Sequence, residues 1–252
     1  MRAALIDADF LPYYVCHNKK DEGGNTTEKT FEECKAGADS LLKSIFTLTK
    51  ATHYILAFTV GKCFRYTVYP EYKANRKYKE VIPYLKETKE YLIENYHSTH
   101  HPDLEADDIV RIVYERDAFI NDDGTETNFI VSPDKDMLML EGKHYNPKTN
   151  EWIETSEAEA NAFFWKSVIC GDGADGVKGL MGKGEAFAKK LFSILANDKY
   201  YPEAVLSAFI SHYNDVHMAI EEYYKNYKCL YILKEYGSYE IPEMKEVSSS
   251  SF

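Results

Sequence analysis

Three short, uninterrupted apolar runs constrain the fold most strongly, because runs of this length without polar alternation are typical of buried parallel strands. They cover Ala3 to Ile6, Tyr54 to Phe58 and Asn128 to Val131. Between them lie helical patterns, one with apolar residues sharing a face over 31–45 and another directly after Asp108. Alternating strands and helices predict an α/β domain with a mostly parallel central sheet flanked by helices.

The pattern changes after the third run. Residues 146–150 are predicted to form a turn, consistent with a hairpin. The following chain is predicted to be mostly helical, interrupted by a glycine-rich stretch over 171–184. We therefore expect an α/β core over 1–160 and a helical lobe over 161–252, with a frayed tail over 248–252.

Four acidic groups lie at the ends of predicted strands or helices. They are Asp7 with Asp9, Glu105 with Asp107 and Asp108, Asp134 with Asp136, and Asp172 with Asp175. Ligands of parallel α/β sheets bind beyond the carboxyl ends of the strands, so several of these groups are expected to meet there. Crowded carboxylates repel each other, and divalent cations remove that conflict; oxygen ligands suit Mg²⁺ or Mn²⁺. Two such ions, about 4 Å apart, can promote phosphodiester cleavage.

Each acidic group alone also has an ordinary structural explanation. An acid after a strand can cap a helix, and acids in a first helical turn favour the helix dipole whatever their function. The sequence D-K-D is common on surfaces, and G-D-G-A-D could form a polar loop. The occurrence of all four groups at the expected ends favours a metal site.

The net charge of −11 argues against a polyanionic partner, but the charge is unevenly distributed. Residues 62–79 carry six basic side chains against the single acid Glu71, with interleaved tyrosines that suit phosphate contact and base stacking. Residues 178–190 carry four lysines against Glu185, and their glycines would let backbone N–H groups approach phosphate oxygens. The structural alternatives are a solvated helix face and a tight turn between helices.

The five cysteines are scattered, odd in number and without a C-x-x-C pair. This pattern indicates reduced thiols and predicts neither a zinc site nor a disulfide framework. No apolar stretch approaches the roughly 20 residues that a membrane helix needs, and the N-terminus does not resemble a signal peptide. We therefore expect a cytoplasmic protein without a membrane partner.

Together the motifs resemble the flap endonuclease, or 5′-nuclease, family, and most closely the 5′-to-3′ exonucleases of bacteriophage replication. The resemblance runs from about Ala4 to Leu191. It is strongest at F-R-x-x-V-Y-P-E-Y-K-A-N-R, L-E-A-D-D, V-S-P-D-K-D and G-D-G-A-D-G-V-K-G-L-M-G-K-G. It implies a PIN-like core, a helix–three-turn–helix motif in the C-terminal lobe, and cleavage of DNA, or of RNA primers on DNA, from the 5′ end. A phage-encoded protein would act in the host cytoplasm, and we expect a monomer.

The resemblance also assigns roles to residues. It implies that two metal ions are bound by Asp7, Glu105, Asp107, Asp134, Asp136, Asp172 and Asp175, with Asp108 supporting them. Lys73 and Arg76 would contact the scissile phosphate, and Tyr72 would stack on a base. Further DNA contacts are expected from Arg65, Lys77, Lys178, Gly179, Gly182, Lys183 and Gly184. The three glycines would form the hairpin that grips duplex backbone and that, in the family, often carries K⁺.

The chain departs from the family pattern at the second strand. The family usually has an Asp directly after it, whereas Thr59 occupies that place here. We hypothesise that Asp9 replaces the missing metal ligand. The family's usual glycine after the first Asp is Ala8, and the short region between Lys79 and Pro102 is not expected to form a long closed arch.

Two other functions stay open on the sequence. A single-strand ribonuclease could use a similar acidic core, although the glycine hairpin suits duplex binding better. A catalytically silent DNA-binding protein is supported only by Thr59, and the other carboxylates argue against it.

Overall fold

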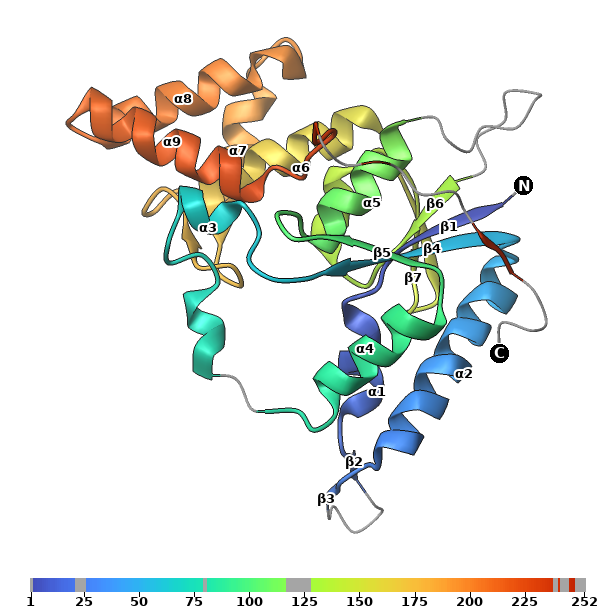
Figure 1. The fold of residues 1–252 in the computed structure, drawn as a ribbon. Coiled ribbons are helices and arrows are strands. Elements are labelled where there is room, and N and C mark those ends of the chain that lie inside the picture. The colour runs from blue at the N-terminus through green and yellow to red at the C-terminus, as the bar shows by residue number, and fades with distance from the viewer. Residues whose placement is uncertain are drawn as a thin grey trace.

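The computed structural model describes residues 2–20, 26–78, 81–116, 128–237, 240 and 245–247 (Figure 1). Its centre is a seven-stranded sheet in the order β11-β4-β1-β6-β7-β8, with β5 also beside β4. The strands are β1 (Ala3–Asp7), β4 (His53–Thr59), β5 (Ser98–His101), β6 (Asn128–Val131), β7 (Gly142–Asn146), β8 (Glu151–Thr155) and β11 (Lys245–Glu246). Only β8 and β11 pair antiparallel, so the predicted mostly parallel sheet is confirmed.

Neighbouring residues of the central strands face opposite layers, as the pleat of a strand requires. Ile6 and Leu56 pack with the layer of α1 (Phe10–Cys16), α2 (Phe31–Thr49) and α4 (Leu85–Asn95). Leu5 and Ile55 pack with the layer that contains α5 (Ala106–Glu115) and the helical lobe. Figure 1 shows α1, α2 and α4 together on one side of the sheet and α5 on the other. Both faces are covered, which explains the uninterrupted apolar runs.

Local signals in the sequence set several element ends. Thr30 and Glu33 form a capping box at the start of α2, and Ser156 and Glu159 form another at the start of α6. Asn150 adopts a left-handed backbone with φ +59° between the antiparallel strands β7 and β8. The hairpin predicted around residues 146–150 is therefore present.

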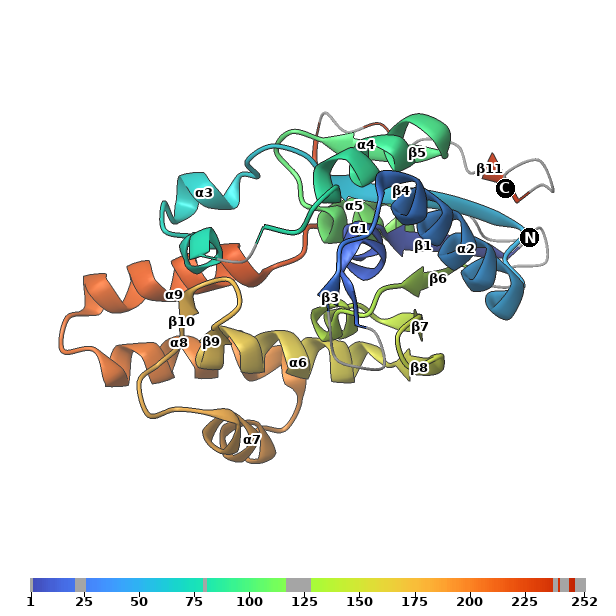
Figure 2. The same ribbon diagram turned by 90° about the horizontal axis from the view of Figure 1, so that it is seen from below.

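The helical lobe consists of α6 (Glu157–Cys170), α7 (Glu185–Ser193), α8 (Tyr201–His212) and α9 (Val216–Leu230), with the short helix η3 (Asp198–Tyr200). The small hairpin of β9 (Gly171–Asp172) and β10 (Val177–Lys178) contacts α6 and α9 (Figure 2). Two other short elements, β2 (Lys19–Lys20) and β3 (Thr26–Thr27), pair with each other. No helix in the described residues is long and apolar enough to cross a membrane.

The predicted division at residue 160 does not follow the structure. That residue lies inside α6, and after α9 the chain returns to the core, where β11 pairs with β4. The Leu233 backbone N–H also donates to the Asp108 carboxylate on α5, at 2.9 Å. Residues 161–252 therefore contribute to the sheet as well as to the lobe. The predicted frayed tail over 248–252 lies outside the described residues.

Candidate active site

The carboxyl ends of β1, β4 and β6 lie side by side and bring the first and third acidic groups together. Asp7 ends β1, and the residues before it pair in register with β4 and β6. The Ser132 hydroxyl donates to the Asp7 carboxylate at 3.0 Å and accepts from the Asp134 backbone N–H at 3.1 Å. An open hollow of about 540 Å³ at this edge is lined in part by Asp7, Asp9 and Asp134. Parallel strands thus gather these carboxylates as the sequence predicted.

Burial and mutual repulsion raise the pKa of several carboxyl groups at this edge of the sheet. Burial raises the pKa of Asp7 to about 7, with further contributions from Asp9 and Asp134, against a Ser132 hydrogen bond that lowers it. Burial also raises the pKa of Asp136 to about 6, reinforced by Asp134 and Asp172. Burial and neighbouring Asp108 raise the pKa of Asp107 well above its usual range. A positive ion at this edge would relieve the repulsion.

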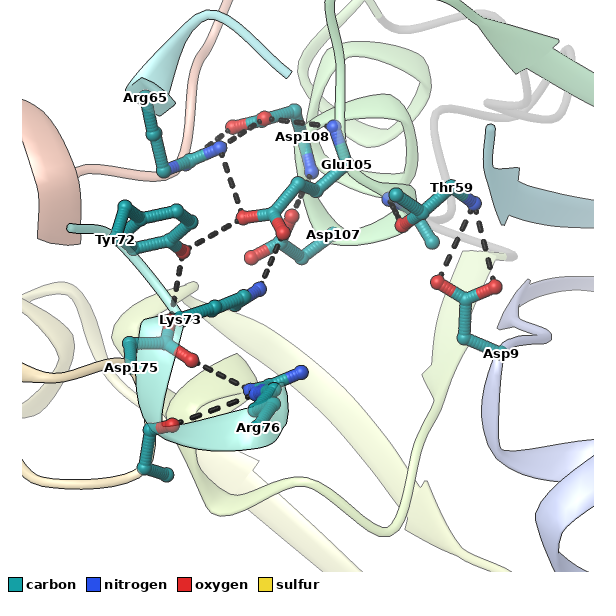
Figure 3. A network of polar contacts seen from close by, with 12 residues as sticks. Asp9, Thr59, Arg65, Tyr72, Lys73, Arg76, Glu105, Asp107, Asp108 and Asp175 are labelled. Carbon is teal, nitrogen blue, oxygen red and sulfur yellow. Dashed lines mark hydrogen bonds and ion pairs between the residues drawn. The ribbon is translucent and has the colours of Figure 1, made fainter. Parts of the chain in front are cut away.

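Glu105 and Asp175 lie in a different environment, because basic side chains compensate them. Lys73 forms an ion pair with Glu105 and lies 3.7 Å from an Asp175 carboxylate oxygen. The guanidinium of Arg76 lies 2.5 Å from the other Asp175 oxygen (Figure 3). Burial opposes ionisation of Glu105, but Lys73 and Arg65 lower its pKa overall, whereas burial dominates at Asp175 and raises its pKa. The predicted phosphate-contacting residues therefore lie within the acidic site.

Lys73 and Arg76 are held there by the backbone of the acidic loop. Lys73 has a left-handed φ of +56°, and its N–H donates to the Asp175 carbonyl at 2.8 Å. The Asn75 amide donates to the Gly173 carbonyl at 2.7 Å, and the Arg76 Nε–H reaches the Ala174 carbonyl at 3.4 Å. The segment that ends in the short helix η1 (Ala74–Tyr78) is thus joined to G-D-G-A-D, although the two are about a hundred residues apart. Lys77 lies in η1, but its side chain is outside the described part of the chain.

Arg65 does not have the predicted role in DNA contact. Its side chain is 1% exposed and makes two hydrogen bonds with the Asp108 carboxylate, at 2.6 and 2.8 Å. It also donates to the carbonyls of Cys229 and Tyr231, at 2.9 and 2.8 Å. Arg65 therefore joins α3 (Arg65–Val68) to α5 and to the end of α9. A count of basic residues cannot distinguish such a buried partner from a surface cation.

Asp108, like Arg65, is held by partners within the protein. It is fully buried, and its oxygens accept from Arg65 and from the backbone N–H groups of Glu105 and Leu233. With these donors around it, Asp108 positions the start of α5 and has no place among metal ligands. Its neighbours Glu105 and Asp107 remain directed to the site side of the helix (Figure 3).

Tyr72 also differs from the prediction. Its side chain is 1% exposed and packs edge-on against Tyr66, with the ring centroids 5.5 Å apart, so the ring cannot stack on a base. Its hydroxyl lies 2.8 Å from a Glu105 oxygen and 2.7 Å from an Asp175 oxygen. Tyr72 therefore connects the acid at the start of α5 to the acid of the G-D-G-A-D loop.

Asp9 and Thr59 form a separate group at the end of β4. Thr59 donates its backbone N–H to Asp9, at 3.3 Å to each oxygen, and its hydroxyl accepts from the Ala106 N–H at 2.9 Å. Asp9 occupies the N-cap position of α1 without capping it. Instead its carboxylate pairs with Lys89 of α4, at 2.7 Å. Lys89 could not be identified from the sequence, because a lone lysine on an amphipathic helix belongs to no motif.

The glycines of the predicted hairpin, Gly179, Gly182 and Gly184, lie in two different environments. A Cβ on Gly179 would lie 2.1 Å from the Cys170 carbonyl carbon, so Gly179 is required for the hairpin to pack. Gly182 has φ +73° with open space around it, and Gly184 is exposed at the start of α7. Lys178 is exposed and Lys183 half-buried. Their predicted contacts with duplex backbone stay predictions.

In the described part of the chain, no three acidic, histidine or cysteine side chains converge closely enough to hold a metal ion in this conformation. The donors nevertheless suit a hard divalent cation, because Asp7, Asp134 and Asp136 supply only oxygen and repel each other. Asp172 lies close enough to raise the pKa of Asp136, although its own side chain accepts from the Ala174 N–H at 2.8 Å.

A mostly parallel sheet with acids at its carboxyl edge and an appended helical lobe defines the PIN-like 5′-nuclease class. A family model described as the 5′-3′ exonuclease, N-terminal resolvase-like domain, matches residues 2–163, and the chain belongs to this family of nucleases. The resemblance inferred from the motifs is therefore confirmed.

Solved structures agree on the fold. The bacteriophage T5 5′-exonuclease with bound zinc is 17% identical with a TM-score of 0.69, and the match covers 91% of this chain and 89% of that one. A bacteriophage T5 flap endonuclease complex with DNA and metal ions is 16% identical with a TM-score of 0.67, covering 91% of both chains. The catalytic core of Rad2 with DNA substrate is 13% identical with a TM-score of 0.51, covering 90% of this chain and 73% of that one.

Proposed function

We propose that this nuclease hydrolyses phosphodiester bonds of duplex DNA at 5′ ends or flaps, using two Mg²⁺ or Mn²⁺ ions held at the acidic edge of the sheet. The observation that carries the proposal is the crowding of Asp7, Asp134 and Asp136, in which burial and the nearby Asp134 carboxylate raise the pKa of Asp7 and of Asp136. The bacteriophage T5 structures that contain metal ions support a metal-dependent reaction in this fold.

The proposed ligands of the two ions are Asp7, Asp107, Asp134, Asp136 and Asp172, with Glu105 and Asp175 on the side of the basic residues. Bound ions would stabilise charge on the phosphate and make a nucleophile of water. Lys73 and Arg76 line a second hollow of about 230 Å³ together with Thr59 and Glu105. A phosphate in this hollow would meet an ammonium and a guanidinium that the acidic loop already holds in place.

Duplex binding is proposed to use the glycine hairpin and its lysines. A Cβ built on Gly182 or on Gly184 would have open space around it, so a phosphate could approach the backbone there, and Lys178 and Lys183 add positive charge. K⁺ is a proposed ligand of this hairpin, where it would add positive charge for phosphate binding. An RNA–DNA hybrid is a second proposed substrate, and phage DNA replication or recombination is the proposed setting. We propose that the protein acts as a monomer.

The test is hydrolysis of a 5′-labelled DNA duplex in Mg²⁺, in EDTA, and in EDTA followed by excess Mg²⁺. We expect cleavage in Mg²⁺, loss in EDTA and recovery on addition of Mg²⁺. Asp136→Asn should abolish cleavage, whereas Glu151→Gln, a change at an exposed acid of β8, should not. Binding without cleavage would favour the silent DNA-binding protein, and cleavage restricted to single-stranded RNA would favour the ribonuclease. Cleavage that survives chelation would refute the metal mechanism.

A further inference from the structure

Lys89 forms an ion pair with Asp9 beside the end of β4, and the function proposed above gives it no role. Its ammonium lies 2.7 Å from an Asp9 oxygen, donates to the Thr59 carbonyl and lies 5.5 Å from the centre of the Phe58 ring. The side chains of Lys89 and Asp9 are 27% and 31% exposed. The pair is therefore open to the site without being fully solvated.

Asp9 has a central position between the two hollows. It lines the larger hollow with Asp7 and Asp134, and it also lines the smaller hollow with Lys73 and Arg76. A carboxylate at this position could serve as a metal ligand if nothing else held it. Two groups hold it: the Lys89 ammonium and the Thr59 N–H both contact its oxygens. The contact of the ammonium with the Thr59 carbonyl in turn fixes Lys89.

We propose that Lys89 is a positioning residue that keeps Asp9 in an ion pair, so that Asp9 is excluded from the metal ligands and adds no net charge to the site. This inference rests on the proposed metal-dependent function. It replaces the hypothesis that Asp9 compensates for Thr59. The place of an acidic ligand at the end of β4 is then filled by a neutral pair that anchors α4 to the strand end.

The proposal makes opposite predictions for the two single substitutions. Lys89→Met leaves Asp9 as an extra, uncompensated carboxylate beside the metal site, so Mn²⁺ should bind more tightly. Asp9→Asn leaves an uncompensated ammonium, so Mn²⁺ should bind more weakly. Each change should be on the order of fivefold, from the Coulomb interaction of one unit charge with a divalent ion near the protein surface. The double variant has no net change in charge and should bind Mn²⁺ within about twofold of the wild type.

The experiment is isothermal titration calorimetry of Mn²⁺ into the metal-free full-length protein and each variant, with thermal unfolding to confirm that each variant folds. Lys86→Met is the matched control, because Lys86 lies on the same helix, is 84% exposed and pairs only with Glu90 among the described residues. Lys89→Arg should retain the wild-type affinity. A role in anchoring α4 alone would lower stability without moving the Mn²⁺ affinity in opposite directions.

The outcomes separate this inference from the proposed function. If the wild type binds Mn²⁺ and the double variant binds it tenfold more weakly, then Asp9 is a ligand and the inference is wrong. Unchanged affinity in both single variants would also overturn it. A wild-type protein that binds no Mn²⁺ would overturn the proposed metal site, and the inference with it.

Discussion

Asp7→Asn should stabilise the metal-free protein at alkaline pH, because the carboxylate of Asp7 is held where charge is unfavourable. Its pKa rises from 3.8 to about 7 on folding, chiefly through burial. This rise in pKa corresponds to at most about 4 kcal/mol of stability, and screening by solvent in the open hollow reduces this to about 1–3 kcal/mol. Asparagine keeps the size of the side chain, and its amide oxygen can accept the hydrogen bond from Ser132.

The sign of the effect depends on pH. Between pH 4 and pH 7 the folded protein keeps a proton on Asp7 that the unfolded chain has released, so the stability of the wild type falls as pH rises through this window. At pH 5 Asp7 is neutral in the folded protein but largely ionised in the unfolded chain, so only part of this destabilisation is present and the variant should gain less than at pH 8. At pH 8 the variant should unfold about 2–10 °C higher, using the shift expected for a chain of this size.

The assay is thermal unfolding by circular dichroism in EDTA at pH 5 and pH 8. Glu151→Gln on the exposed strand β8 serves as the control and should change little at either pH. Saturating Mg²⁺ should stabilise the wild type at pH 8 more than it stabilises Asp7→Asn. If Asp7→Asn unfolds at or below the wild-type temperature at pH 8 in EDTA, the crowded-carboxylate explanation of the site is wrong.

Four further substitutions test other parts of the site. Arg65→Ala should lower stability by about 3–5 kcal/mol in urea unfolding, because it leaves the Asp108 carboxylate buried and unpaired; a loss below about 1 kcal/mol would contradict the buried pair. Lys73→Ala and Arg76→Ala should lower turnover more than duplex affinity, and equal losses would make them docking residues only. Gly182→Val should strain the φ of +73° and weaken duplex binding, with a shallower dependence on salt. Equal affinities and salt slopes would reduce the hairpin to a connector.

The sheet could be predicted because its signals are local. The runs at Ala3 to Ile6, Tyr54 to Phe58 and Asn128 to Val131 are buried on both faces, and burial of that kind leaves a continuous apolar stretch. β5 and β11 could not be predicted in this way. The strand Ser98–His101 is polar and only partly buried, and β11 has two residues, so their pairing with β4 depends on tertiary contacts alone.

The sequence could predict which acidic residues lie at the site, but not which basic residues pair with them. Asp7 and Asp134 follow strands whose ends must meet, so their proximity follows from topology. The pairing of Asp108 with Arg65 spans 43 residues and that of Asp9 with Lys89 spans 80, and neither spacing is periodic. Such pairs depend on how the helices pack on the sheet, which the sequence of one chain does not reveal.

The most direct test of the central claim is the single-turnover rate of cleavage of a 5′-flap DNA duplex as a function of Mg²⁺ concentration. If two ions held by the acidic edge act together, the rate should rise with about the second power of subsaturating Mg²⁺ and should vanish in its absence. A first-power dependence at every subsaturating concentration, or a rate that does not depend on Mg²⁺, would contradict a site in which these carboxylates hold two ions for cleavage.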